Sequence, residues 1–78
     1  MKVFKLVRGK DVSGVSGVGH VLDGVTFDDG TTIIWWKGEV IGRRSSISVF
    51  KSYDDFLAIH VRPHPENDNL LVEKEVTP

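Results

Sequence analysis

Hydrophobic and polar positions alternate most clearly in residues 24–36, where two strand-like runs flank the dipeptide Asp29-Gly30. An Asp-Gly pair between two such runs is a strong β-hairpin signal, because both residues tolerate the positive φ angles of tight turns. Similar short runs predict further strands at residues 3–8, 18–28, 45–50 and 70–74. The chain is therefore expected to be mainly β.

One segment, residues 52–60, has the spacing of a helix instead. Ser52 can cap its free N–H groups, and Asp54 and Asp55 suit the positive end of the helix dipole. Pro63 prevents the helix from continuing. The residues that share one helical face are Tyr53, Phe56, Leu57 and His60.

This order of elements, four or five strands with one short helix before the last strand, matches a small SH3-like antiparallel barrel. The alternative is an open antiparallel sheet with the helix packed on it. No internal repeat or linker divides the sequence, so residues 1–78 are expected to form one domain, with 75–78 fraying.

The chain is small for a protein that must build its own hydrophobic core. A domain of 78 residues buries only about 60% of the surface that its unfolded chain exposes. Cysteine is absent, which excludes disulfide bonds and thiolate metal sites as sources of stability. We therefore expect the protein to associate with itself as a homo-oligomer.

Charge and hydropathy limit the other partners. Ten lysine and arginine residues against eleven aspartate and glutamate residues give a net charge of -1, so neither a long nucleic acid nor an anionic membrane is expected. No apolar run reaches the roughly 20 residues of a membrane span or resembles a signal peptide. The expected location is the cytoplasm of a bacterium or of an infected host cell.

The length of the hairpin loop decides which of two adjacent tryptophans faces the core. If the loop is Asp29-Gly30 alone, Trp36 lies on the same face as Val25, and Trp35 lies on the other. If Asp28 extends the loop, the pairing slips by one residue and Trp35 joins Val25 inside. In either case one tryptophan is left on the second face.

A strand that is apolar on both faces must be covered on both. One interpretation is that the helix covers the second face through Tyr53, Phe56 and Leu57. The other is an exposed aromatic patch that binds another subunit, a partner protein or a flat ligand. The sequence leaves both interpretations open.

Two segments have residues suited to holding a phosphate. Arg43 and Arg44 stand beside Ser45, a combination that can bind a phosphate through two guanidinium groups and a hydroxyl. In the glycine-rich residues 9–19, the N–H groups around Ser16 and Gly17 could cradle an anion. The alternative without a ligand is that the two arginines are solvated loop charges and that the glycine-rich residues form a flexible loop.

Catalysis and metal binding have no comparable support. His20, His60 and His64 are present, but Pro63 separates the last two, so they cannot act as ligands from one helical face. No nucleophile elbow, paired-carboxylate pattern or nucleotide-hydrolase loop is present. The protein is therefore expected not to be an enzyme and to carry no cofactor or metal.

Several motifs resemble a group of short actinobacterial and bacteriophage proteins without an assigned function. The shared patterns are Val-Ser-Gly-x-Gly-x-Val at 15–21, Gly-Val-x-Phe-x-Asp-Gly at 24–30, Trp36, a serine-rich strand at 45–50 and Asp-x-x-Ala-Ile-His at 55–60. The resemblance implies no activity and no site residues.

The sequence as a whole favours a non-enzymatic, homo-oligomeric binding protein for a small phosphorylated or nucleotide-like ligand. Trp35 or Trp36 would stack on the flat part of the ligand while Arg43 and Arg44 hold its charge. If the phage resemblance holds, such a protein could sequester a host immune signal. The alternative function is a protein–protein interaction module or inhibitor that uses the aromatic strand.

Overall fold

The computed structural model describes residues 1–9, 18–38, 44–63, 65 and 68–77. In chain order the elements are β1 (Lys2–Arg8), β2 (Gly19–Thr26), β3 (Thr32–Trp36), β4 (Ser46–Phe50), α1 (Tyr53–His60) and β5 (Asn69–Glu75). The mainly β class and the single helix before the last strand are therefore confirmed. The glycine-rich residues 10–17 and the loop residues 39–43 lie outside the described ranges.

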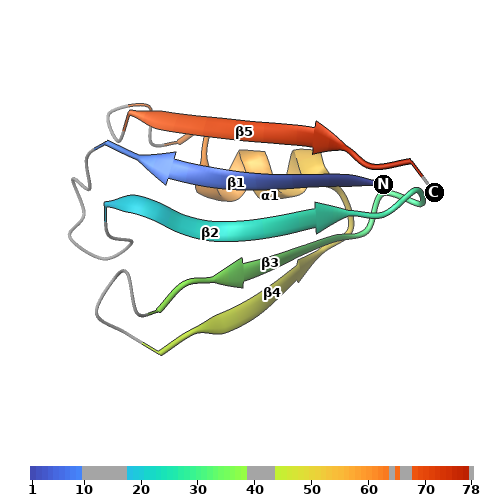
Figure 1. The fold of residues 1–78 in the computed structure, drawn as a ribbon, viewed down its shortest axis with the longest axis horizontal. Helices are drawn as coiled ribbons and strands as arrows, with labels where there is room; N and C mark the ends of the chain where they lie inside the picture. Colours follow the sequence, from blue (N-terminus) through green and yellow to red (C-terminus); the bar gives the residue numbers. More distant parts are fainter. Residues whose placement is uncertain (10–17, 39–43, 64, 66–67, 78) are drawn as a thin grey trace.

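All five strands form one antiparallel sheet in the order β4-β3-β2-β1-β5. Within the described residues the edge strands β4 and β5 do not pair with each other, so the sheet is open (Figure 1). The open-sheet alternative is confirmed and the SH3-like barrel is wrong. A small barrel fills its interior with side chains from its own strands, whereas here α1 packs against the sheet and supplies part of the core.

The turn between β2 and β3 contains three residues. The Gly30 N–H donates to the Phe27 carbonyl, and the Phe27 N–H donates to the Thr31 carbonyl, both at 2.9 Å. Gly30 has a φ of 97°, the left-handed conformation that closes a three-residue loop. Val25 consequently pairs with Ile33. The three-residue alternative is confirmed and the two-residue loop is wrong.

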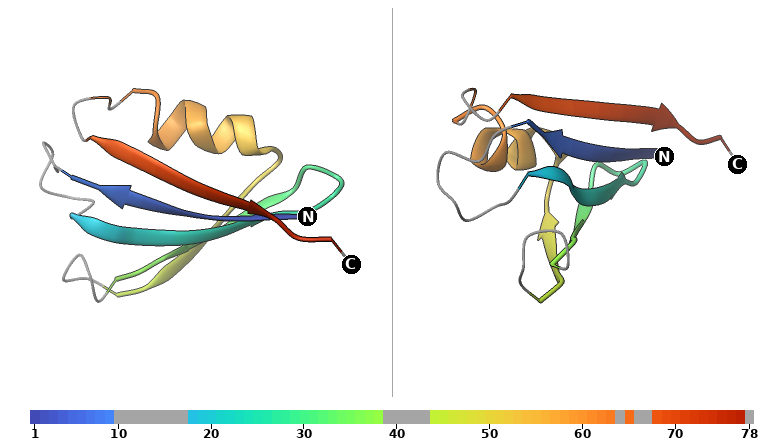
Figure 2. Two further views of the ribbon diagram at one scale, coloured as in Figure 1. Left: turned by 45° about the horizontal axis from the view of Figure 1, so that its top comes forward. Right: turned by 60° about the vertical axis from the view of Figure 1, so that its left-hand side comes forward.

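Helix α1 begins with the cap that the sequence predicts. The Ser52 Oγ accepts the backbone N–H of Asp55 at 3.1 Å, and Asp54 and Asp55 lie in the first turn. Figure 2 shows that α1 lies against a single face of the sheet. We call this the inner face, and the opposite side the outer face.

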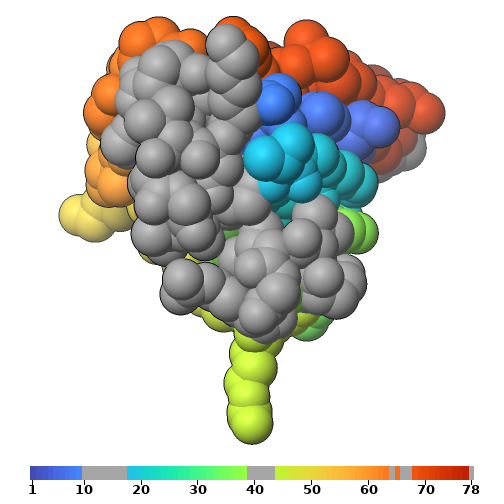
Figure 3. All heavy atoms as spheres, turned by 90° about the vertical axis from the view of Figure 1, so that its left-hand side faces the viewer, coloured from blue at the N-terminus to red at the C-terminus, as the bar shows by residue number. Residues whose placement is uncertain are grey.

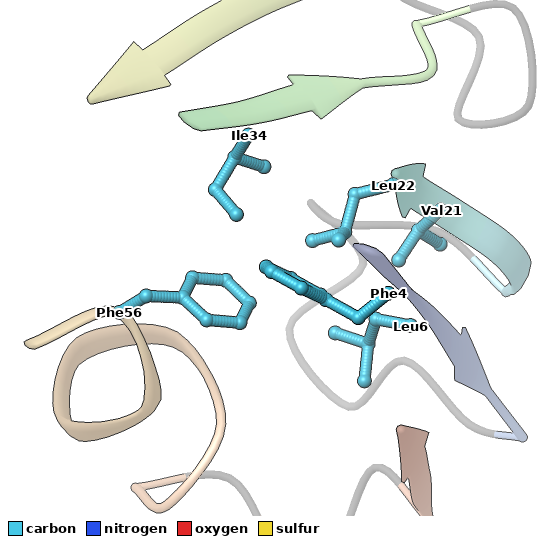
Figure 4. Packing of buried hydrophobic residues seen from close by; sticks show 6 residues of the cluster. All are labelled: Phe4, Leu6, Val21, Leu22, Ile34 and Phe56. Atoms are coloured by element: carbon cyan, nitrogen blue, oxygen red, sulfur yellow. The ribbon is translucent and has the colours of Figure 1, made fainter. Parts of the chain in front are cut away.

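The hydrophobic core lies between α1 and the inner face (Figure 4). The fully or almost fully buried apolar residues are Phe4, Leu6, Val21, Leu22, Ile34 and Phe56. Tyr53 and Leu57 pack against this cluster, and Phe56 lies within it. The expectation that these three helical residues cover the sheet is confirmed.

Gly24 marks a close approach between β2 and a side chain of β1. The Phe4 ring covers Gly24 so tightly that an added Cβ would come within 3.0 Å of three of its carbons. The irregularity in the β1–β2 pairing does not lie at Gly24. The pairing of β1 with β2 shifts between Leu6 and Val7, where Val21 is the extra residue.

Arg8 ends β1 as a buried cation with only 2% of its surface exposed. Its Nη2 donates to the His60 carbonyl at 3.0 Å, and its Nε donates to the Asn69 Oδ1 at 3.2 Å. Asn69 also donates to the Val61 carbonyl at 3.4 Å. The guanidinium thus joins β1, the end of α1 and the start of β5.

Candidate functional site

The outer face of the sheet is formed by the alternate side chains that point away from α1. Within the described ranges no element packs over this face, and several of its apolar side chains are exposed. An antiparallel sheet normally presents polar residues to solvent, so an apolar exposed face indicates a binding surface. Its residues include Val3, Lys5, Asp23, Val25, Ile33, Trp35, Ile47, Val49, Leu70, Val72 and Lys74.

The two tryptophans have different environments. Trp36 faces inward, where its Nε1 donates to the Ser48 Oγ at 3.0 Å and its ring meets the edge of His60 at a centroid distance of 5.0 Å. Trp35 lies on the outer face with 45% of its surface exposed. The sequence placed Trp35 and Val25 on one face correctly, but that face is the exposed one. Trp35 is therefore the tryptophan available for binding.

Two adjoining hollows cross the outer face. The one beside Trp35 has a volume of about 230 Å³ and is also lined by Val25 and Ile33. The other has a volume of about 370 Å³, and Val3 and Val72 contribute to its apolar wall. Asp23 and Gly24 line both hollows. An elongated ligand could therefore contact the indole ring and extend towards β5.

Lys5 and Lys74 border the larger hollow from β1 and β5. The pairing of these strands sets Lys5 opposite Val72 and Lys74 opposite Val3, which places the two cations diagonally around the apolar wall. Neither lysine forms an ion pair within the part of the chain that the structure describes. Both ammonium groups are available for an anionic ligand.

Asp23 is the acidic residue between the two hollows. Its Oδ1 lies 2.6 Å from the His20 Nε2, and its Oδ2 lies 3.8 Å from the Lys37 Nζ. The Lys37 ammonium partly offsets the negative charge of the carboxylate that an anionic ligand would approach. The contacts are solvent-exposed and contribute little to stability. Asp23 can still accept a hydrogen bond from a ligand N–H or O–H group.

The loop residues expected at the site are only partly described. Arg44 and Ser45 are exposed and lead into β4, close to the end of the β3–β4 pair that carries Trp35. The Ser45 Oγ accepts the Gly38 N–H at 3.0 Å. Figure 3 shows the yellow-green segment that leads into β4 projecting from the body of the molecule. Arg43, Ser16 and Gly17 lie outside the described residues.

A comparison with models of known protein families shows the family of this chain. The family model described as Acb5 phage protein matches residues 1–70, which is most of the sequence. The chain belongs to the Acb5 phage protein family. The bacteriophage part of the resemblance is thereby confirmed. Searches of curated proteins and of solved structures found no match.

Sequence reasoning missed three residues at the hollows of this Acb5 family protein: Lys5, Lys74 and Asp23. The lysines come from opposite ends of the chain and meet only because β1 pairs with β5. A detectable signal was the alternation of valine and lysine in both segments, which puts apolar and basic side chains on one face.

The described residues contain no group of three His, Cys, Asp or Glu side chains placed to hold a metal ion. Within the same ranges, no helix has both the length and the apolar character needed to cross a membrane. The outer face with its two hollows remains the candidate site of this Acb5 family protein.

Proposed function

We propose that this phage protein binds a small phosphorylated, nucleotide-like ligand on its outer face. We further propose that it holds the ligand without converting it, and so withdraws an immune signal from the host. The observation that carries the proposal is the exposed Trp35 ring beside a hollow that leads to Lys5 and Lys74, neither of which forms an ion pair with the described residues.

The base and the phosphate of such a ligand need different partners, and the outer face supplies both. Bases stack on aromatic rings whatever their hydrogen-bonding pattern, and Trp35 supplies such a ring between apolar neighbours. Phosphates need cations, which Lys5 and Lys74 supply at the adjoining hollow. Arg44 offers a further cation near the Trp35 end of the site.

The size of the site and the charge of the protein favour a small ligand over a polymer. The hollows are local, and the net charge of -1 provides no general attraction for a polyanion. The carboxylate of Asp23 would also repel a continuous phosphate backbone that ran across both hollows. A single molecule with a flat ring and one or two phosphates avoids this repulsion.

The direct test is a thermal-shift panel of mono-, di- and cyclic nucleotides with the purified protein. A ligand that binds only the folded state raises the melting temperature in proportion to the logarithm of its concentration over Kd. We expect at least one nucleotide to stabilise the protein. If none does so at concentrations well above those of cellular signals, the binding proposal is wrong.

Substitutions then locate the site. Trp35→Ala is expected to weaken binding of the stabilising nucleotide by about 1–3 kcal/mol, the usual contribution of base stacking on an aromatic ring. Phe27→Ala is the matched control, because Phe27 is 42% exposed but lines neither hollow. Lys5→Ala and Lys74→Ala should weaken binding more at low salt than at high salt. Equal losses for Trp35→Ala and Phe27→Ala would contradict the proposed site.

Whether the ligand is held or converted is a separate measurement. The nucleotide is incubated with the protein, released by heating and identified by mass spectrometry. Sequestration predicts that the released nucleotide has its original mass. Release of a nucleotide with altered mass would show conversion and would contradict the holding part of the proposal, while leaving the binding site intact.

A partner protein is the second candidate occupant of the outer face. The specific observation in its favour is the breadth of the face, where exposed apolar residues extend from Ile47 on β4 to Leu70 on β5. The test is a pull-down from host extract. A single stoichiometric host protein that is lost with Trp35→Ala and kept with Phe27→Ala would support this alternative over a nucleotide.

A further inference from the structure

The two edges of the sheet differ in how they are protected against pairing. Natural proteins protect exposed edges with charged side chains, proline or bulges. β5 carries Glu73, Lys74 and Glu75, whereas β4 contains no charge and no proline. β4 also pairs with β3 in regular register, without a bulge. Among the described residues, β4 is therefore the edge that remains open to another strand.

The side chains of β4 are also the most exposed large hydrophobic groups in the described residues. Val49 is 65% exposed and Ile47 is 61% exposed, both on the outer face. Such residues on an unprotected edge would be covered if a second strand lay beside them. Backbone hydrogen bonding and burial of these side chains therefore both favour the pairing of β4 with another strand.

We propose that β4 is the dimer interface of this protein, where it pairs antiparallel with β4 of a second copy. The two five-stranded sheets then form one continuous sheet. This inference does not depend on the proposed ligand, because it concerns the edge of the sheet and not the hollows.

The alternation of β4 selects the register. If Ser48 of both copies lies on the two-fold axis, all five residues pair, and Ile47 of each copy lies opposite Val49 of the other. Apolar side chains then meet on the outer face. A slip by one residue in either direction would place Val49 opposite a serine instead of Ile47, which loses this contact.

The charges of β5 explain why pairing stops at a dimer. Pairing of β4 with itself is isologous and uses up the open edge of both copies. Pairing of β5 with itself would place the charged residues Glu73, Lys74 and Glu75 along the joint, and charged side chains protect an edge strand against such pairing. The remaining edges of the dimer are the two charged β5 strands, so the sheet does not extend into a fibre.

The absence of cysteine permits a clean crosslinking test of the register. Ile47→Cys and Val49→Cys are made as separate proteins and then mixed under mild oxidation. In the proposed register each thiol lies opposite the other only in the mixture, so we expect disulfide-linked heterodimers and little crosslinking of either protein alone. A mixture of Leu70→Cys with Val72→Cys on β5 is the control. Crosslinking at β5 that equals that at β4 would overturn the proposal.

Sedimentation velocity tests the interface without crosslinking. The unmodified protein should sediment as a dimer and Val49→Lys as a monomer. The substitution puts one lysine from each copy at the joint, opposite Ile47 of the other copy, and a charged side chain on an edge strand opposes pairing. Leu70→Lys is the matched control, since Leu70 is 59% exposed on the outer face of the other edge. Circular dichroism confirms that each variant is folded. A monomeric unmodified protein, or identical behaviour of the two lysine variants, would overturn the proposal.

Discussion

Gly24→Ala is the substitution that tests the packing of the core most directly. The Gly24 φ is not in the left-handed region, so the backbone itself would accept alanine. The obstacle is the Phe4 ring, three carbons of which would lie within 3.0 Å of the new Cβ. Ordinary contact begins at 3.4 Å, so the ring must move.

The surroundings of Phe4 determine what this movement costs. The ring is 4% exposed and lies 5.5 Å from the Phe56 ring and 4.8 Å from the Tyr53 ring, measured between centroids. It cannot swing away without displacing α1. Overpacking of this kind costs about 1–3 kcal/mol, whereas replacing glycine at an unstrained position gains about 0.4–1 kcal/mol. We expect a net loss of about 1–2 kcal/mol in the free energy of unfolding.

Urea denaturation of four proteins measures this effect as a double-mutant cycle. They are the unmodified protein, Gly24→Ala, Phe4→Leu and the double variant. Leucine lacks the distal ring carbons, so Gly24→Ala should cost nothing or be slightly stabilising in that background. The slope of the free energy with urea concentration should stay constant. An equal cost of Gly24→Ala in both backgrounds would refute the steric explanation.

Three further predictions concern polar groups on the inner side of the sheet. Arg8→Met should lower the free energy of unfolding by about 2–4 kcal/mol in urea, because the carbonyl of His60 loses a charged, buried donor. Ser48→Ala should cost about 1 kcal/mol and change Trp36 fluorescence, because the indole N–H loses its acceptor. Burial, and secondarily Glu73, raises the pKa of Tyr53 to about 12 from an ordinary 10. The folded state therefore keeps the phenol proton longer than the unfolded state, and this stabilisation is lost as pH rises from 10 through 12. Tyr53→Phe should reduce that alkaline loss in denaturation curves, and an unchanged pH dependence would contradict the assignment.

The sequence predicted the elements well because their signals are local. The Ser52 cap, the acidic first turn and the Asp-Gly turn act within a few residues, and the structure contains all of them. Closure of the sheet is a non-local property. The same strands along the chain can form a barrel or an open sheet, and the difference is whether the edge strands pair. Within the described residues β4 and β5 do not pair, and α1 covers the inner face instead.

The sequence could predict only those features of the candidate site that depend on a single hairpin. The loop length put Trp35 on the same face as Val25, and the hydrogen bond from Gly30 to the Phe27 carbonyl selects that register. The sequence expected that face to be inside, and the exposure of Trp35 follows only from the packing of α1 on the opposite face. The basic part of the site depends on Lys5 and Lys74, which meet through pairing of the first and last strands. No local pattern specifies that pairing, so sequence reasoning sought the cations on the nearby arginine loop.

The proposed ligand site lies at the two hollows of the outer face, whereas the proposed dimer interface lies at the β4 edge. Whether the two are independent can be measured. Face-to-face association of two sheets would bury Trp35 and exclude a ligand, whereas pairing through β4 leaves the hollows open. Val49 pairs with Ile33, but it lines neither hollow. A monomeric Val49→Lys protein should therefore retain most of the thermal stabilisation by the same nucleotide. If the loss of the dimer abolished nucleotide binding in a folded Val49→Lys protein, the hollows of one copy would not suffice, and the ligand site would have to include the second copy.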